Sequence, residues 1–204
     1  TLEIKSSQSV IGKSGAFKIS TPTTTTQPVV SGMYATLVST NSSVSVVDGA
    51  NNDTGLFSIK YKIKAVGTDL YIPGSTGAVS YVVDKGGVAI SSSAFTTALT
   101  DLSGSSKTAN GNYVIKNGEE KTFEFAANVP MNTTNTAGQY RLSINGLRWR
   151  STDTTGSPNT TTTGLENFKT NYQNITCVSD RDSQIASIQA TLDILIQALK
   201  DLKN

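Results

Sequence analysis

The segment from Phe57 to Ala65 alternates apolar and polar residues without a break. Every second residue is aliphatic or aromatic, and the residues between them are Ser58 and three lysines. Successive side chains of a β-strand point to opposite faces of the sheet, so this pattern predicts a strand with one buried face and one face in water. The chain is therefore expected to build a sheet that covers an apolar core.

Shorter strand-like segments fill the rest of the body, residues 29–178, and turn signals such as Gly86-Gly87 and Asn117-Gly118 separate them. Many short strands with regular turns and no helical periodicity predict an all-β fold, an Ig-like antiparallel β-sandwich. Asn145-Gly146 lies inside an apolar segment and indicates either a bulge or a hairpin turn. The further strands expected are Met33–Ser39, Ser43–Val47, Asp69–Ile72, Ala78–Asp84, Tyr113–Lys116, Lys121–Val129, Gln139–Trp149 and Tyr172–Val178.

The first 28 residues differ from the body. Residues 1–20 form a β-prone, extended N-terminal arm with strand-like pieces at Leu2–Lys5 and Ala16–Ile19, and residues 21–28 are a Thr/Pro linker. Two prolines around a polar tract favour an extended linker. Two arrangements are open: the arm pairs with the sheet edge of a neighbouring subunit, or it folds back as the first strand of its own sandwich.

The last segment, residues 179–204, has the periodicity of a helix. Its Ile and Leu residues follow the a/d spacing of a heptad, which predicts one amphipathic, coiled-coil-like helix over Asp180–Asn204. An isolated helix of this length is marginal in water, so its apolar stripe needs a partner. A trimer, a larger bundle or docking onto the sandwich body fits better than a dimer. The expected association residues are Ile185, Ile188, Leu192, Leu195, Leu199 and Leu202.

Composition argues against several classes of function. Charged residues make up 16% of the chain, the net charge is +2 and no basic block occurs, so no nucleic-acid partner is expected. No apolar run approaches the roughly 20 residues that span a bilayer. The chain has no histidine, which removes Ser-His-Asp and Cys-His catalysis and His-based metal sites. We therefore expect no catalytic residues and no cofactor.

Two small features of the sequence each allow two interpretations. Asp48, Asn51 and Asp53 lie in an oxygen-rich turn that is a weak candidate for calcium, although an ordinary Asx-type turn explains it as well. Cys177, the only cysteine, is a candidate for an interchain disulfide in an oxidising compartment. A small buried thiol at a strand end is the alternative.

Residues 151–163 form a long loop rich in Thr and Gly, next to Trp149 between Arg148 and Arg150. Long loops often carry binding sites, and an Arg-Trp-Arg sequence can present a platform for a sugar. The alternative is a mobile surface loop beside a tryptophan that belongs to the core.

Three stretches, Phe57–Pro73, Tyr140–Thr155 and Gly164–Thr170, together resemble uncharacterised exported proteins of ultrasmall, Parcubacteria-like bacteria. In these proteins an Ig-like β domain is often followed by a short helical tail, and Gln184–Asn204 is similar to such a tail. The resemblance implies a location at the cell surface, in a surface layer, a pilus-like fibre or an adhesin. It supplies no functional residues.

The sequence therefore predicts a secreted, non-enzymatic subunit of an extracellular surface assembly. It would associate, through its arm and its C-terminal helix, with further copies of itself or with other surface proteins. The alternative is an adhesin or a glycan-binding module that uses the 151–163 loop.

Overall fold

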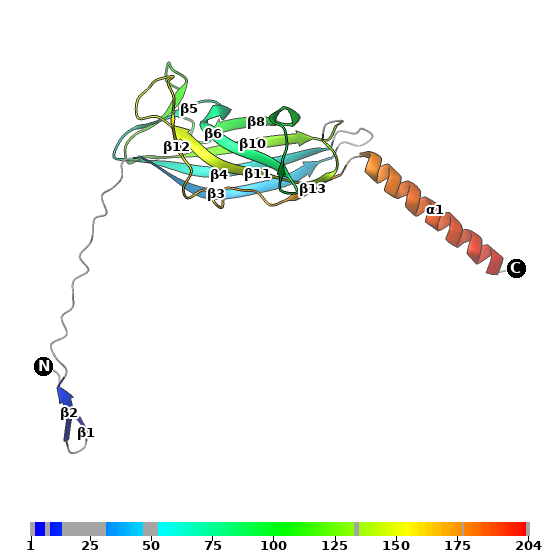
Figure 1. Ribbon diagram of the computed structural model, residues 1–204, viewed down its shortest axis with the longest axis horizontal. Coiled ribbons are helices and arrows are strands. Elements are labelled where there is room, and N and C mark those ends of the chain that lie inside the picture. The colour runs from blue at the N-terminus through cyan, green and yellow to red at the C-terminus, as the bar shows by residue number, and fades with distance from the viewer. Residues whose placement is uncertain are drawn as a thin grey trace.

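The computed structural model describes residues 3–6, 9–13, 32–46, 53–132, 135–176 and 178–202, and it describes side chains from residue 32 to 176 and from residue 185 to 202 within these ranges. This part of the chain is mostly β-strand, all of it paired antiparallel, with one helix at the C-terminal end (Figure 1). The predicted all-β character and the single C-terminal helix are confirmed.

One sheet has four strands, in the order β3-β4-β10-β8. They are β3 (Gly32–Ser45), β4 (Thr54–Val66), β10 (Glu120–Pro130) and β8 (Thr96–Asp101). The alternation seen in the sequence holds in β4, whose odd-numbered residues from 57 to 65 are all buried. The lysines between them line the outer face, where Lys62 and the β10 residue Glu120 form a 2.7 Å ion pair.

The second sheet has five strands around β11 (Gly138–Trp149). On one side β11 pairs with β6 (Val79–Lys85), which pairs with the two-residue β7 (Val88–Ala89). On the other side, β12 (Asn159–Thr161) and β13 (Gln173–Ile175) pair with opposite ends of β11. A small additional sheet joins two further strands, β5 (Leu70–Pro73) and β9 (Asn112–Ile115).

The inner faces of the two large sheets share one apolar core, as in a sandwich. The ring of Tyr81, on β6, lies 4.7 Å from the ring of Phe125, on β10, so aromatic side chains bridge the two sheets. Burial raises the pKa of Tyr61, whose side chain lies in the same core. The largest fully buried side chains come from both sheets and from β5 and β9, and include Tyr61, Tyr140, Phe57, Phe123, Phe125, Ile59, Ile63, Leu70, Ile115 and Leu142.

Two bulges lie within long strands of the body. The pairing of β11 with β6 shifts between Ile144 and Gly146, so Asn145-Gly146 is a bulge and not a hairpin turn. The pairing of β3 with β4 shifts between Leu37 and Ser39 but continues to Ser45. The two strands expected at 33–39 and 43–47 are therefore one long strand. A bulge lets a strand bend without ending it.

Three strands of the body were not predicted: β7, β8 and β12. β8 alternates half-buried and exposed residues, half of them threonines, and so lacks an apolar pattern. β12 falls inside the segment expected to be a loop, residues 151–163, where it pairs with Leu147–Trp149.

The N-terminal arm forms a hairpin where described: β1 (Glu3–Ser6) pairs with β2 (Ser9–Lys13). Neither strand pairs with either body sheet, so the described part of the arm is neither a single extended strand nor the first strand of the sandwich. The expected strand Ala16–Ile19 and the linker at 21–28 lie outside the described residues.

The helix α1 runs from Val178 to Leu202 and begins two residues earlier than predicted. The last two residues of the predicted helix, 203 and 204, lie outside the described residues. The helix projects away from the body, at the end where β13 lies (Figure 1). No helix in the described ranges has the length and apolar character needed to cross a membrane.

Candidate functional site

The helix α1 exposes all six of the predicted association residues. Their exposed fractions run from 52% at Leu192 to 85% at Leu202. Side chains that docked on the body would be largely covered. The structure therefore does not have the alternative arrangement, in which the helix packs on its own sandwich. The stripe is left to face water.

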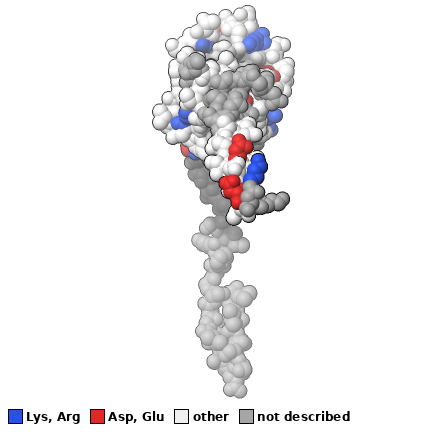
Figure 2. Space-filling model, turned by 90° about the vertical axis from the view of Figure 1, so that its right-hand side faces the viewer, with Lys and Arg blue, Asp and Glu red and all other residues white. Residues whose placement is uncertain are grey.

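The apolar surface of α1 is wider than the a/d stripe. Ile194 and Ile196 are exposed as well, at 70% and 42%. An apolar hollow of about 260 Å³ runs along the stripe from Ser187 to Leu195. Acidic and basic side chains both lie along the helix, and charges of both signs are scattered over the visible face of the body (Figure 2).

Covering this apolar surface would stabilise the helix. Complete burial of a Leu or Ile side chain stabilises a structure by about 1.5–3 kcal/mol. Side-chain hydrogen bonds within the helix, such as Gln197 Nε2 to Asp201 Oδ1 at 2.9 Å, add little to a helix in water. Packing of its apolar stripe against another apolar surface is therefore the main source of stability available to α1.

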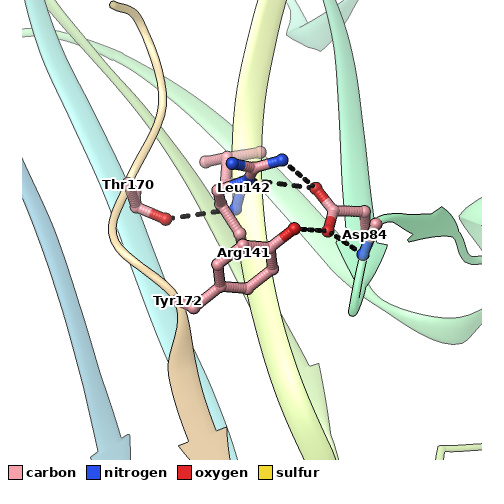
Figure 3. A network of polar contacts seen from close by, with 6 residues as sticks. Asp84, Arg141, Leu142, Thr170 and Tyr172 are labelled. Carbon is pink, nitrogen blue, oxygen red and sulfur yellow. Dashed lines mark hydrogen bonds and ion pairs between the residues drawn. The ribbon is translucent and has the colours of Figure 1, made fainter.

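A buried polar cluster fixes the chain just before the helix. Asp84, at the end of β6, is 5% exposed, and one of its oxygens accepts hydrogen bonds from the Tyr172 hydroxyl at 2.7 Å and from the Gly87 backbone N–H at 2.9 Å. Its other oxygen pairs with the Arg141 guanidinium at 3.1 Å (Figure 3). The guanidinium also lies 4.4 Å from the centre of the Tyr172 ring, a cation–π distance.

The same segment is tied to β11 by its backbone. Thr170 donates its N–H to the Leu142 carbonyl at 2.9 Å, and its hydroxyl accepts from the Leu142 N–H at 3.1 Å (Figure 3). The hydrogen bond that Tyr172 gives to Asp84 raises the pKa of the tyrosine. Sequence reasoning missed this cluster, because its members come from three separate segments and only the Asp-Lys-Gly-Gly turn carries a local signal.

The 151–163 loop is anchored at its start. Asp153 accepts hydrogen bonds from the Asn112 amide and the Thr108 hydroxyl, both at 2.8 Å. The hydrogen bond from Asn112 is the main cause that lowers the pKa of Asp153, with smaller contributions from Thr108 and Asn110. Asn112 is itself 2% exposed. Residues 153–154 are therefore held against the start of β9, and the mobile-loop alternative does not describe them.

The Arg-Trp-Arg sequence does not form an open platform. Trp149 is partly buried, packs against the core and donates its Nε1–H to the Thr161 hydroxyl at 3.1 Å. Arg148 donates to the Gly77 carbonyl at 3.1 Å, and Arg150 to the Asn112 side chain at 2.9 Å. These contacts agree with the alternative in which Trp149 belongs to the core.

Three of the remaining predicted residues, Asp48, Asn51 and Cys177, lie outside the described residues. Asp53 is described, and it is 1% exposed at the start of β4, where its backbone carbonyl accepts from the Met131 N–H at 2.7 Å. Within the described ranges, no group of three or more acidic or cysteine side chains is placed to hold a metal ion.

No protein-family model, curated protein or solved structure matches this chain.

Proposed function

We propose that this protein is a non-enzymatic structural subunit of an extracellular surface assembly, in which copies are joined through α1. One observation carries the proposal: the helix presents a continuous apolar stripe that its own body leaves uncovered. An apolar stripe of this length gains most of its stability by meeting other stripes.

Further copies of the same chain are the partners that fit best. Apart from Lys203, the e and g positions of the heptad from residue 184 onward carry no charge and include Gln184, Gln189 and Thr191, so pairs of opposite charge between helices cannot select a different partner. Ile196 and Ala198 widen the apolar face at e and g, which favours a bundle of three or more helices over a two-stranded coil. A self-complementary stripe needs only identical chains to be buried.

The body fits an Ig-like module, the finer fold assignment that we propose. The strand orders β3-β4-β10-β8 and β12-β11-β6-β7 correspond to the A-B-E-D and G-F-C-C′ orders of that fold. A second feature supports the assignment: Tyr140, near the start of β11, donates its hydroxyl to the Thr136 carbonyl at 2.6 Å. This contact resembles the tyrosine corner that Ig-like domains have near the start of strand F.

An extracellular location agrees with the resemblance to exported surface proteins. A stable sandwich that ends in an association helix is a suitable building unit for a surface layer or a fibre. The absence of histidine, which removes Ser-His-Asp and Cys-His catalysis, supports the non-enzymatic part of the proposal.

The test is the mass of the full chain in solution. Leu192→Asp with Leu195→Asp places two charges in the stripe, and we expect this variant to be monomeric by mass photometry and to lose helicity. The matched control is Ala190→Asp with Gln197→Asp, which adds the same charges on the opposite side of the helix and should keep the wild-type mass. Equal masses for all three proteins would contradict the proposal.

A second candidate function is glycan binding beside the anchored loop. A polar cleft of about 370 Å³ is lined by Lys107, Asn110, Asn112, Arg150 and Thr155. Lys107, Asn110 and Arg150 already donate to backbone carbonyls of the body, but each has further N–H groups beyond these bonds. Such donors suit sugar hydroxyls and carboxylates. Specific signals on a glycan array that Asn110→Ala removes would support this function, and an array without signals would oppose it.

A further inference from the structure

The strand β6 is only partly covered along one edge. The short strand β7 pairs with its last two residues, Asp84 and Lys85, and one more hydrogen bond runs from the Ile90 N–H to the Val83 carbonyl at 3.0 Å. In the part of the chain that the structure describes, no strand pairs with residues 79–82 on this side. Four residues of an otherwise central strand therefore form an open sheet edge.

The backbone N–H and C=O of Tyr81 point toward this open edge. Tyr81 lies opposite Ile144 of β11, and Ile144 donates its N–H away from β6, to the Phe168 carbonyl at 2.8 Å. Ile144 and Tyr81 are therefore a non-hydrogen-bonded pair of the antiparallel ladder. The two residues of such a pair direct their backbone groups away from each other, toward the outer edges of the two strands. The N–H and C=O of Tyr81 thus face outward, on the same edge as the Val83 carbonyl that Ile90 reaches.

A groove runs beside this edge. It has a volume of about 410 Å³, and five consecutive β6 residues, Val79–Val83, form one wall. Ala89 and Ile90 lie at one end, and Phe95 contributes an aromatic ring that meets Tyr81 edge-on at 6.1 Å. The groove has both apolar and polar lining, with Ser80, Ser92 and Arg148 beside the apolar residues. An open ladder beside such a groove is a combination that can receive an extended peptide: the backbone supplies affinity and the groove takes alternate side chains.

We propose that this edge accepts the N-terminal hairpin of a second copy, so that β1 or β2 continues the sheet beyond β6. The inference rests on the proposed assembly and names a second contact within it. It also gives the arm a partner of defined location, the groove between β6 and Phe95.

The hairpin has the properties that such a partner needs. Its two strands pair only with each other among the described residues, and a two-stranded hairpin alone is marginally stable in water. Ile4 stands between Glu3 and Lys5, so one apolar side chain can enter the groove while charged neighbours stay in water. Copies already joined through α1 raise the effective concentration of hairpins near each groove.

The experiment is photo-crosslinking of the full chain with a benzophenone amino acid at Ala89, an exposed residue on the groove. Val88 provides the control position, because it is the neighbouring residue of β7, is 71% exposed and does not line the groove. Isotopically labelled and unlabelled copies are mixed before irradiation. We expect products that join position 89 to residues 1–13 and combine one labelled with one unlabelled peptide.

Ile4→Asp should lower the yield of these products about tenfold, the effect of losing one buried aliphatic side chain, whereas Lys5→Asp should not. Three results overturn the proposal: no product with residues 1–13, products within single copies only, or a yield that Ile4→Asp leaves unchanged. An oligomer without these products rejects the edge contact and leaves the helix proposal standing. Products that persist in the Leu192→Asp/Leu195→Asp variant at higher protein concentration support the edge contact without the helix.

Discussion

The body and the helix α1 use apolar periodicity in opposite ways. In β4 every second side chain is buried against the facing sheet, with Ile59 and Ala65 at 0% exposure. In α1 the apolar stripe has an equally regular spacing, yet its best-covered member, Leu192, is 52% exposed. The apolar residues of β4 are thus covered by another part of the same chain, whereas those of α1 are not. Substitutions in the two regions should therefore change different measurements.

The largest effect on unfolding is expected in the core. Phe125 is fully buried and its ring contacts Tyr81 across the two sheets. Phe125→Ala removes these contacts and leaves a cavity, and we expect the free energy of unfolding to fall by about 3–5 kcal/mol. Urea denaturation followed by the fluorescence of Trp149, the only tryptophan, measures it.

Leu199→Ala is the matched change in the helix. It also truncates an apolar side chain, but one that is 65% exposed, so the unfolding of the body should be unchanged while self-association weakens. A large loss of body stability in this variant would show that the two regions are not independent.

A smaller loss is expected at the polar cluster that precedes the helix. Asp84→Ala leaves the Arg141 guanidinium and the Tyr172 hydroxyl without their acceptor, and we expect about 2–3 kcal/mol of destabilisation. This is below the range for fully buried pairs because the Arg141 side chain is 26% exposed. Tyr172→Phe removes only one donor and should cost less. If the urea midpoints of both variants matched that of the wild type, the cluster would not be holding this segment.

The smallest effect is a pH dependence at Asp153. Hydrogen bonds from Asn112 and Thr108 hold its folded pKa below the usual value near 4, so its contribution to stability is complete above that pH. The contribution should decline as the pH falls through the folded pKa. Asp153→Asn cannot titrate, so the stability difference between wild type and variant should shrink on acidification. A difference that stays constant from pH 7 to pH 3 would contradict this.

The parts of the fold that sequence reasoning found are those whose signal is local. The alternation in β4 and the heptad in α1 each lie within one segment, and both elements were predicted. β8 was missed because an edge strand with exposed threonines needs no apolar alternation. β3 was divided in two because Thr40, Asn41 and Ser42 are all polar, so the sequence shows no apolar alternation there although the strand continues through them.

The polar contacts of the body could not be predicted in the same way. Asp84 and Tyr172 are far apart in the chain, and only the path of residues 168–175 along β11 brings them together. The anchoring of Asp153 by Asn112 likewise depends on how β9 is placed against the loop. The association stripe was predicted, but its separation from the body follows only from the observed exposures.

The positions at which the chain enters and leaves the body have a mechanical consequence. β3 begins at one end of the body, and β13 ends at the other, beside α1 (Figure 1). Tension applied through these two ends would pull β3 lengthwise along β4, to which it is paired from Gly32 to Ser45. Ladder hydrogen bonds lie perpendicular to such a pull, so they must break together in shear and cannot open one after another. A body with this geometry resists stretching most strongly along the line that joins its two terminal segments.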